Sequence, residues 1–227
     1  KGLFDVVDID PFGTPAMFTQ STAANIRPGG LICISATDTS ALCGTYHDPC
    51  LRKYGAKPLK TEYCHENGIR ILIAFISRNL AVNQKYLHVL FSHSTEHYMR
   101  VYAIVKRGGK KTNKALDNIG FIAHCPNCLH RETTYGFAPK IPHTCPECGG
   151  EYDVAGPLWL GKIWDKEFIY NTMELVKNLN LNKKDDLMSL FEKCYMEADG
   201  PVTFYDIHKI CKKLKISSPK INDVMDE

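Results

Sequence analysis

Apolar and polar positions along the first part of the chain predict alternating strands and helices. Residues 4–9, FDVVDI, form a β-branched run typical of a buried parallel strand. Thr14 can cap and Pro15 can open a helix that runs to about residue 26, and the apolar run 31–35 predicts a second strand. A strand, a helix and a strand in this order predict two parallel strands of one sheet. Functional sites of such sheets lie beyond the carboxyl ends of the strands.

The rest of the chain is predicted to be largely helical, with one hairpin. The pair Asn67-Gly68 predicts a break before a mostly buried helix over residues 69–80. Strands over 85–92 and 98–106 are predicted to pair as a hairpin at the edge of the sheet. Four other helices are predicted, over residues 46–57, 165–180, 184–198 and 204–214.

Size and charge set broad limits on the kind of protein. The chain has 227 residues, 44% of them hydrophobic, which is enough to bury a sizeable core in one large or two modest domains. Its net charge of +3 is too small to indicate a polyanionic partner by itself. No apolar run approaches the roughly 20 residues that span a bilayer, and no secretory signal opens the chain. We therefore expect a cytoplasmic protein with no membrane attachment and no obligate protein partner.

A basic stretch divides the chain. Residues 106–114 carry five positive charges and no acid, and the segment that follows contains paired cysteines. We therefore predict two domains, residues 1–107 and residues 108–227.

Four cysteines have the spacing of a structural zinc site. Two Cys-x-x-Cys pairs, separated by sixteen residues, match the arrangement in which four thiolates surround one ion. Four thiolates fill the coordination shell, so a catalytic zinc is not expected. The predicted ligands of this zinc ribbon are Cys125, Cys128, Cys145 and Cys148.

The sequence Asp10-Pro11-Phe12-Gly13 ends the first strand and carries the candidate chemistry. Taken alone, four such residues are also an ordinary strand-ending turn. They resemble, however, the motif with which amino-directed methyltransferases hold a base. An exocyclic amine must be oriented by acceptors, here the Asp10 carboxylate and the Pro11 carbonyl, while an aromatic ring stacks on the base. Asp8 lies two residues earlier on the strand and points to the same face as Asp10.

Longer stretches add a more specific resemblance. Residues 7–15, 35–44 (SATDTSALCG), 50–55 (CLRKYG), 98–101 (YMRV), the cysteine pairs and residues 156–159 (GPLW) are similar to the tRNA (guanine26-N2)-dimethyltransferase family. The resemblance covers most of the chain. It implies transfer of one or two methyl groups from S-adenosylmethionine to the N2 amine of guanine 26 of tRNA.

The resemblance also implies roles for individual residues. Asp10, Pro11 and Phe12 would be catalytic, and the pocket around them would include four further residues: Asp8, Gly13, Thr37 and Asp38. Asp8 is equally well explained by a backbone contact, and Thr37 and Asp38 by a polar cluster at a strand end. The family's glycine-rich loop that grips S-adenosylmethionine has no counterpart here. We therefore expect an interior fragment that lacks the N-terminal cofactor-binding half, with most cofactor-binding residues before residue 1.

Basic residues supply candidate RNA contacts. They are Arg52, Lys53, Arg107, Lys110 and Lys111, whose charges could bind phosphates. The alternative is that each basic cluster is simply a solvated surface.

The expected fold class is α/β: a partial Rossmann-like class I methyltransferase sheet, followed by a zinc ribbon with helices in an α+β domain. The rival function is a non-catalytic nucleic-acid-binding module in which the ribbon is the active part. A DNA amino-methyltransferase would share the base-holding motif, but not residues 36–39 (ATDT) together with the ribbon. The arrangement of residues 10–12 separates these possibilities, because a catalytic site needs them gathered in an open pocket whereas a scaffold would bury or scatter them.

Overall fold

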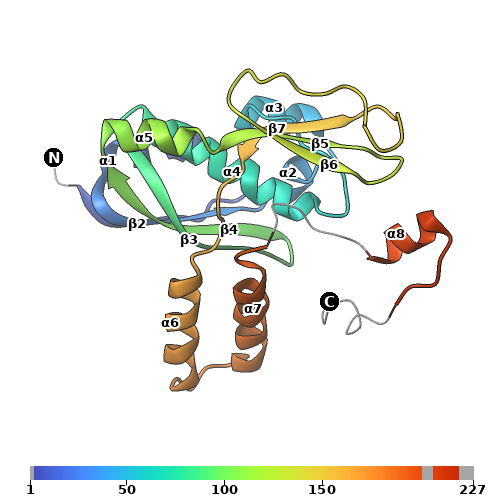
Figure 1. Ribbon diagram of the computed structural model, residues 1–227. Helices are drawn as coiled ribbons and strands as arrows, with labels where there is room; N and C mark the ends of the chain where they lie inside the picture. Colours follow the sequence, from blue (N-terminus) through green and yellow to red (C-terminus); the bar gives the residue numbers. More distant parts are fainter. Residues whose placement is uncertain (1–2, 201–206, 220–227) are drawn as a thin grey trace.

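The computed structural model describes residues 3–200 and 207–219, which form two sheets packed around a long helix (Figure 1). The larger sheet has the order β1-β2-β4-β3, and its strands are β1 (Phe4–Ile9), β2 (Ile26–Ala36), β3 (Lys85–Thr95) and β4 (Tyr98–Arg107). Strands β1 and β2 are parallel and are connected by helix α1 (Ala16–Asn25), whereas the other pairs are antiparallel. The predicted strand–helix–strand unit and the edge hairpin are therefore confirmed.

Strand β1 differs from the prediction in its burial. Its composition predicts a buried strand, yet it lies at the edge of the sheet, and Phe4 and Val6 are more than half exposed. A parallel strand is buried when neighbouring strands or helices cover it, and no strand among the described residues pairs with the outer edge of β1. The apolar composition of β1 thus correctly predicts an extended strand, but it wrongly predicts that the strand is buried.

The long helix α4 (Cys64–Ala81) begins before the point predicted from the sequence. Asn67 and Gly68, expected to break the chain, lie inside its first turns. A Cβ atom at Gly68 would come within 2.5 Å of Cε of Met99 and 3.1 Å of Cβ of Leu42. Glycine is present because the helix passes close to these side chains, which is a packing requirement and not a turn. Two short helices, α2 (Thr39–Leu42) and α3 (His47–Tyr54), precede it.

The smaller sheet packs on the opposite side of α4 (Figure 1). Its order is β6-β5-β7, with β5 (Ile119–His124), β6 (Arg131–Tyr135) and β7 (Asp153–Trp159), and helix α5 (Gly109–Leu116) leads into it. One hydrophobic cluster includes Ile73 of α4, Val101 of β4 and Leu158 of β7. Residues from both sides of the expected 107/108 boundary thus share a core, and the division into two domains stays a prediction.

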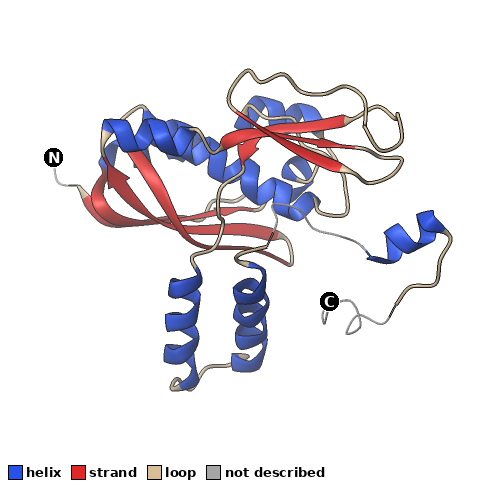
Figure 2. Ribbon diagram, in the orientation of Figure 1, coloured by secondary structure: helices blue, strands red, loops and turns tan. Residues whose placement is uncertain are grey.

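Three helices complete the described part of the chain: α6 (Lys166–Lys177), α7 (Lys184–Glu197) and α8 (Ile207–Leu214). Figure 2 shows α6 and α7 side by side below the larger sheet and extending away from it, and Ile169 and Phe191 belong to one buried cluster with Phe91 of β3. These helices agree with the predicted ones, although positions 204–206 of the last prediction lie outside the described residues. No helix in the described ranges has both the length and the apolar character needed to cross a membrane.

Candidate active site at the carboxyl edge of the parallel strands

The loop after β1 and the loop after β2 are joined by one backbone–backbone hydrogen bond and one backbone–side-chain hydrogen bond. The Gly13 amide donates to Oγ1 of Thr37 at 2.7 Å, and the Thr37 amide donates to the Gly13 carbonyl at 2.9 Å. Gly13 adopts φ +91°, a conformation that other residues rarely take. The sequence prediction that these residues meet at one edge of the sheet is correct, and the contact fixes the position of the Asp10–Gly13 loop.

The side chains that would touch a base are open to solvent. Phe12 is fully exposed, and the side chain of Asp10 is 68% exposed. Pro11 lies between them and is partly buried. Asp8, two residues before Asp10 on β1, is half exposed. The motif is therefore accessible to solvent and not buried as a scaffold segment would be, and its catalytic role stays a prediction.

Arg100 is a member of this site that the sequence patterns do not reveal. It lies on β4 opposite Ser35 of β2, and only 16% of its side chain is exposed. Its guanidinium binds the Asp8 carboxylate at 2.7 Å and donates to the hydroxyls of Ser35 and Tyr102, while Oδ1 of Asp10 lies 3.9 Å away. The available signals were an arginine within the largely apolar stretch 98–105 of β4 and its place in residues 98–101, which carry part of the family resemblance.

Asp38 forms a second polar cluster beside the loop. Its carboxylate accepts hydrogen bonds from the Tyr54 hydroxyl at 2.7 Å and from Nζ of Lys53 at 3.0 Å. Thr14 in turn donates to the Tyr54 oxygen at 2.9 Å. Burial, and secondarily the charge of Asp38, raises the pKa of Tyr54 well above its usual range, so its hydroxyl keeps its proton. This network anchors α3 to the candidate site, and Arg52 is exposed on the same helix.

The other predicted RNA-binding residues lie at the far end of the larger sheet. Met99, near the start of β4, pairs with Ala36 close to the Asp10 loop. Arg107 is the last residue of β4 and lies at the other end of the strand. Eight residues of strand separate these points by about 25 Å. Lys110 and Lys111 are exposed on α5, just beyond Arg107. The two predicted basic clusters are therefore not brought together.

The four paired cysteines converge after β5. Sγ atoms of Cys125 and Cys148 lie 3.4 Å apart, those of Cys128 and Cys145 lie 3.5 Å apart, and all four are within 4.8 Å of one another. A tetrahedral zinc with Zn–S bonds of about 2.3 Å separates its sulfurs by about 3.8 Å, so the described positions fit this ion.

Together, the parallel pair with its connecting helix and the open Asp-Pro-Phe-Gly loop at the carboxyl edge place the chain among α/β proteins of the methyltransferase type. The sequence profile described as "TRM: N2,N2-dimethylguanosine tRNA methyltransferase" matches residues 1–227. The chain belongs to this family.

Individual relatives agree with this assignment. The chain is 55% identical to the "tRNA (guanine(26)-N(2))-dimethyltransferase" of Methanobrevibacter smithii, over 98% of this chain and 57% of the relative. It is 54% identical to the protein of the same name from Methanothermobacter thermautotrophicus, over 99% of this chain and 59% of the relative. A solved structure, "Complex structure of Trm1 from Pyrococcus horikoshii with S-adenosyl-L-Methionine", is similar with a TM-score of 0.88 and 32% identity, over 98% of this chain and 57% of that chain.

The chain thus spans less than three fifths of the length of these proteins. The family expected from the sequence is confirmed, as is the mixed α/β fold. The comparisons do not bear out the further expectation that the chain is an interior fragment lacking the N-terminal half.

Proposed function

We propose that this chain carries the base-binding and catalytic loop of an S-adenosylmethionine-dependent enzyme that methylates the N2 amine of guanine 26 in tRNA, once or twice. The observation that supports the proposal most strongly is the open cluster at the carboxyl edge of β1 and β2. There the Asp10–Gly13 loop is held by Thr37 and is accompanied by Asp38 and Asp8.

Each residue of the loop has a role in this reaction. The guanine amine would donate hydrogen bonds to the Asp10 carboxylate and to the Pro11 carbonyl, and the exposed ring of Phe12 would stack on the base. Positive charge builds on N2 as it attacks the methyl group, and the Asp10 carboxylate stabilises that charge and accepts the proton that N2 then loses. S-adenosylmethionine supplies the activated methyl group. Gly13 and Thr37 keep the loop in place, and Asp8 and Asp38 line the pocket.

The described residues fit the acceptor base better than the cofactor. Within residues 3–200 and 207–219 no turn from a strand to a helix has the G-x-G-x-x-G spacing: β1 leads to α1 through DPFGTP, and β4 leads to α5 through Gly108-Gly109 alone. We therefore assign no cofactor-binding residue within them.

We further propose that the four cysteines hold a structural zinc ion in a ribbon module within residues 108–227, which would form the second of two domains. The sulfur positions support this, and the ion would crosslink the loops at Cys125–Cys128 and Cys145–Cys148. Metal analysis of the purified protein should give one zinc per chain. A Cys128→Ser, Cys148→Ser double variant should lose it, whereas Cys194→Ser should retain it; zinc retained by the double variant would refute the ribbon.

The tRNA is the proposed partner. Arg52 and Lys53 would contact phosphates near the target base, which is supported by their position on the helix that is anchored to Asp38 by Lys53 itself. Arg107, Lys110 and Lys111 would form a separate contact about 25 Å away. Reversal of the charges of Lys110 and Lys111 should weaken tRNA binding and reduce its salt dependence, and unchanged binding at moderate salt would mean that this cluster is only solvated.

The enzymatic proposal is tested by methyl transfer from labelled S-adenosylmethionine to an unmodified tRNA transcript. The full-length protein would be compared with its Asp10→Ala variant, and the nucleoside product would be identified by mass. We expect N2-methylated guanosine from the first and a loss of at least a hundredfold in the second. Equal activity of both would move catalysis away from Asp10, and tRNA binding without any methylation would favour the non-catalytic module.

A further inference from the structure

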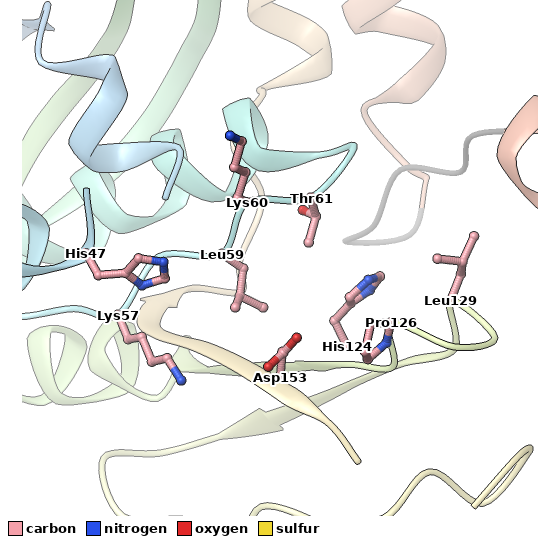
Figure 3. Close-up of a pocket in the computed structure, with 9 residues that line it drawn as sticks. All are labelled: His47, Lys57, Leu59, Lys60, Thr61, His124, Pro126, Leu129 and Asp153. Carbon is pink, nitrogen blue, oxygen red and sulfur yellow. The ribbon is translucent and has the colours of Figure 1, made fainter. Parts of the chain in front are cut away.

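A separate pocket of about 370 Å³ lies between the segment after α3 and the cysteine-containing loops (Figure 3). In Figure 3, Leu59 lies near the middle, with His47 and Lys57 on one side and His124 on the other. The remaining lining residues are Lys60, Thr61, Pro126, Leu129 and Asp153. None of these side chains belongs to the site at Asp10.

The walls of this pocket are held by contacts that do not depend on a ligand. The backbone of Lys57 exchanges two hydrogen bonds with Gly156 of β7, at 2.8 and 2.9 Å. The ring of His124 is buried and packs edge-on against Tyr63, with 5.6 Å between ring centroids. The Arg131 guanidinium lies 4.1 Å from the centre of the Tyr63 ring and also pairs with Glu62. The pocket is therefore largely preformed, which lowers the ordering cost of binding.

The chemistry of the lining matches a nucleotide. Leu59 and Leu129 give an apolar surface, and the exposed imidazole of His47 offers a face on which a base can stack. Asp153 is exposed and can accept hydrogen bonds from amino or imino groups of a base edge. Lys57 and Lys60 are exposed, and neither forms an ion pair with a described residue, so their charges are available to a phosphate.

The position of the pocket relates it to the candidate active site. His47 begins α3, and Lys53 near the end of the same helix pairs with Asp38. These two positions are separated by six residues, about 9 Å along the helix axis. Gly44, on the segment that leads from Asp38 to α3, packs directly on the backbone of Leu59 and Lys60. RNA that presents one base to Asp10 can therefore extend to this pocket.

We propose that the pocket binds one unpaired nucleotide of the RNA substrate, with the base against Leu59 and its phosphate toward Lys57 and Lys60. The assignment rests on the proposed function, because it takes tRNA to be the ligand. It adds a second point of contact that would fix the orientation of the RNA relative to the Asp10 loop.

The first test measures the affinity of the protein for an unmodified tRNA transcript at several salt concentrations. A Lys57→Glu, Lys60→Glu double variant should bind about tenfold more weakly for each lysine–phosphate interaction that it removes, and the slope of log affinity against log salt should fall by about 1 to 2. Lys183→Glu is the matched control, because it reverses an exposed charge on the turn before α7 and should leave binding unchanged. Equal binding by the double variant and the wild type would overturn the proposal.

A second variant distinguishes a bound base from simple attraction of phosphates. Asp153→Ala removes a negative charge, so electrostatics alone would strengthen tRNA binding. Removal of an acceptor for the base edge would weaken it instead, by about tenfold. Weaker tRNA binding by the variant supports a base bound in the pocket, and tighter tRNA binding refutes a bound base.

Methyl-transfer activity, measured beside tRNA binding, shows which of the two proposals fails. If tRNA is methylated normally while the pocket variants bind as the wild type does, the pocket proposal fails and the enzymatic proposal stands. If the wild type binds tRNA through the pocket and never methylates it, the enzymatic proposal fails alone. Photo-crosslinking of 4-thiouridine-substituted tRNA should place one nucleotide on residues 57–61, and a crosslink map without this segment would also contradict the pocket.

Discussion

Replacement of Arg100 by methionine should destabilise the protein by about 3 kcal/mol. The guanidinium is mostly buried, and methionine keeps much of its stem while removing every hydrogen bond. The bond to Asp8 is screened, because that carboxylate is half exposed, and contributes no more than about 1 kcal/mol. Ser35 is 1% exposed, so its hydroxyl would be left without this partner at a cost of about 1–3 kcal/mol. Loss of the bond to Tyr102 adds about 0.5–1.5 kcal/mol.

Thermal and urea unfolding would measure this change in stability, which should lower Tm by about 6–12 °C in a chain of this size. Arg27→Met is the matched control, since Arg27 pairs with Asp5 at 2.5 Å but both side chains are more than half exposed. We expect that variant to stay within about 0.5 kcal/mol of the wild type. The reasoning is refuted if the two arginine variants lose equal stability. Methyl transfer would show whether Arg100 also positions Asp10 through Asp8, because Arg100→Lys should then keep stability better than activity.

Further substitutions and a labelling experiment test local features of the fold. Gly13 and Gly44 share a positive φ, but a Cβ would meet nothing within 4 Å at Gly13 and would lie 2.6 Å from the Lys60 nitrogen at Gly44. Urea unfolding should therefore show a loss of about 1–2 kcal/mol for Gly13→Ala and at least about 3 kcal/mol for Gly44→Ala, and equal losses would contradict the packing at Gly44. A hydrogen bond from Cys43, with a smaller contribution from the charge of His65, lowers the pKa of Cys64 to about 6 although burial opposes this. Alkylation of Cys64 should consequently be half-maximal near pH 6, rather than near the usual value of about 8.5, and Cys43→Ala should move the midpoint upward.

Local patterns predicted most elements of the fold because they depend on short stretches of sequence. The β-branched run of β1, the hairpin of β3 and β4, and the helices α6 and α7 all follow from such patterns. The exposure of β1 and the continuity of α4 through Gly68 could not be predicted in this way. Both depend on what lies next to the element in space, which for Gly68 is Met99 from a strand thirty-one positions later.

The candidate site likewise contains residues whose proximity could be predicted from the sequence and residues whose proximity could not. Asp10, Thr37 and Asp38 follow parallel strands, whose carboxyl ends meet at one edge, so their proximity was predictable. Arg100 joins them only because β4 pairs with β2 in a register that sets it opposite Ser35. The pocket at Leu59 likewise requires the smaller sheet to pack against the segment after α3. The sequence patterns predicted the hairpin that contains β4, but not this register with β2 and not the packing of the smaller sheet.

The exposure of Phe12 leads to one more prediction about how the site works. A fully exposed ring contributes almost nothing to folding, so the Asp10 loop must be held by the Gly13–Thr37 hydrogen bonds instead. Phe12→Ala should therefore leave the free energy of unfolding within about 0.5 kcal/mol of the wild type. The same substitution removes a stacking interaction worth about 1–3 kcal/mol to a bound base, so kcat/KM for tRNA methylation should fall by about 5- to 150-fold. Thr37→Val should instead lower the free energy of unfolding, because it removes the Oγ1 acceptor. It should keep the stacking interaction, because it leaves the Phe12 ring intact. A Phe12→Ala variant that lost stability but methylated tRNA normally would show that the ring holds the loop and does not touch the base.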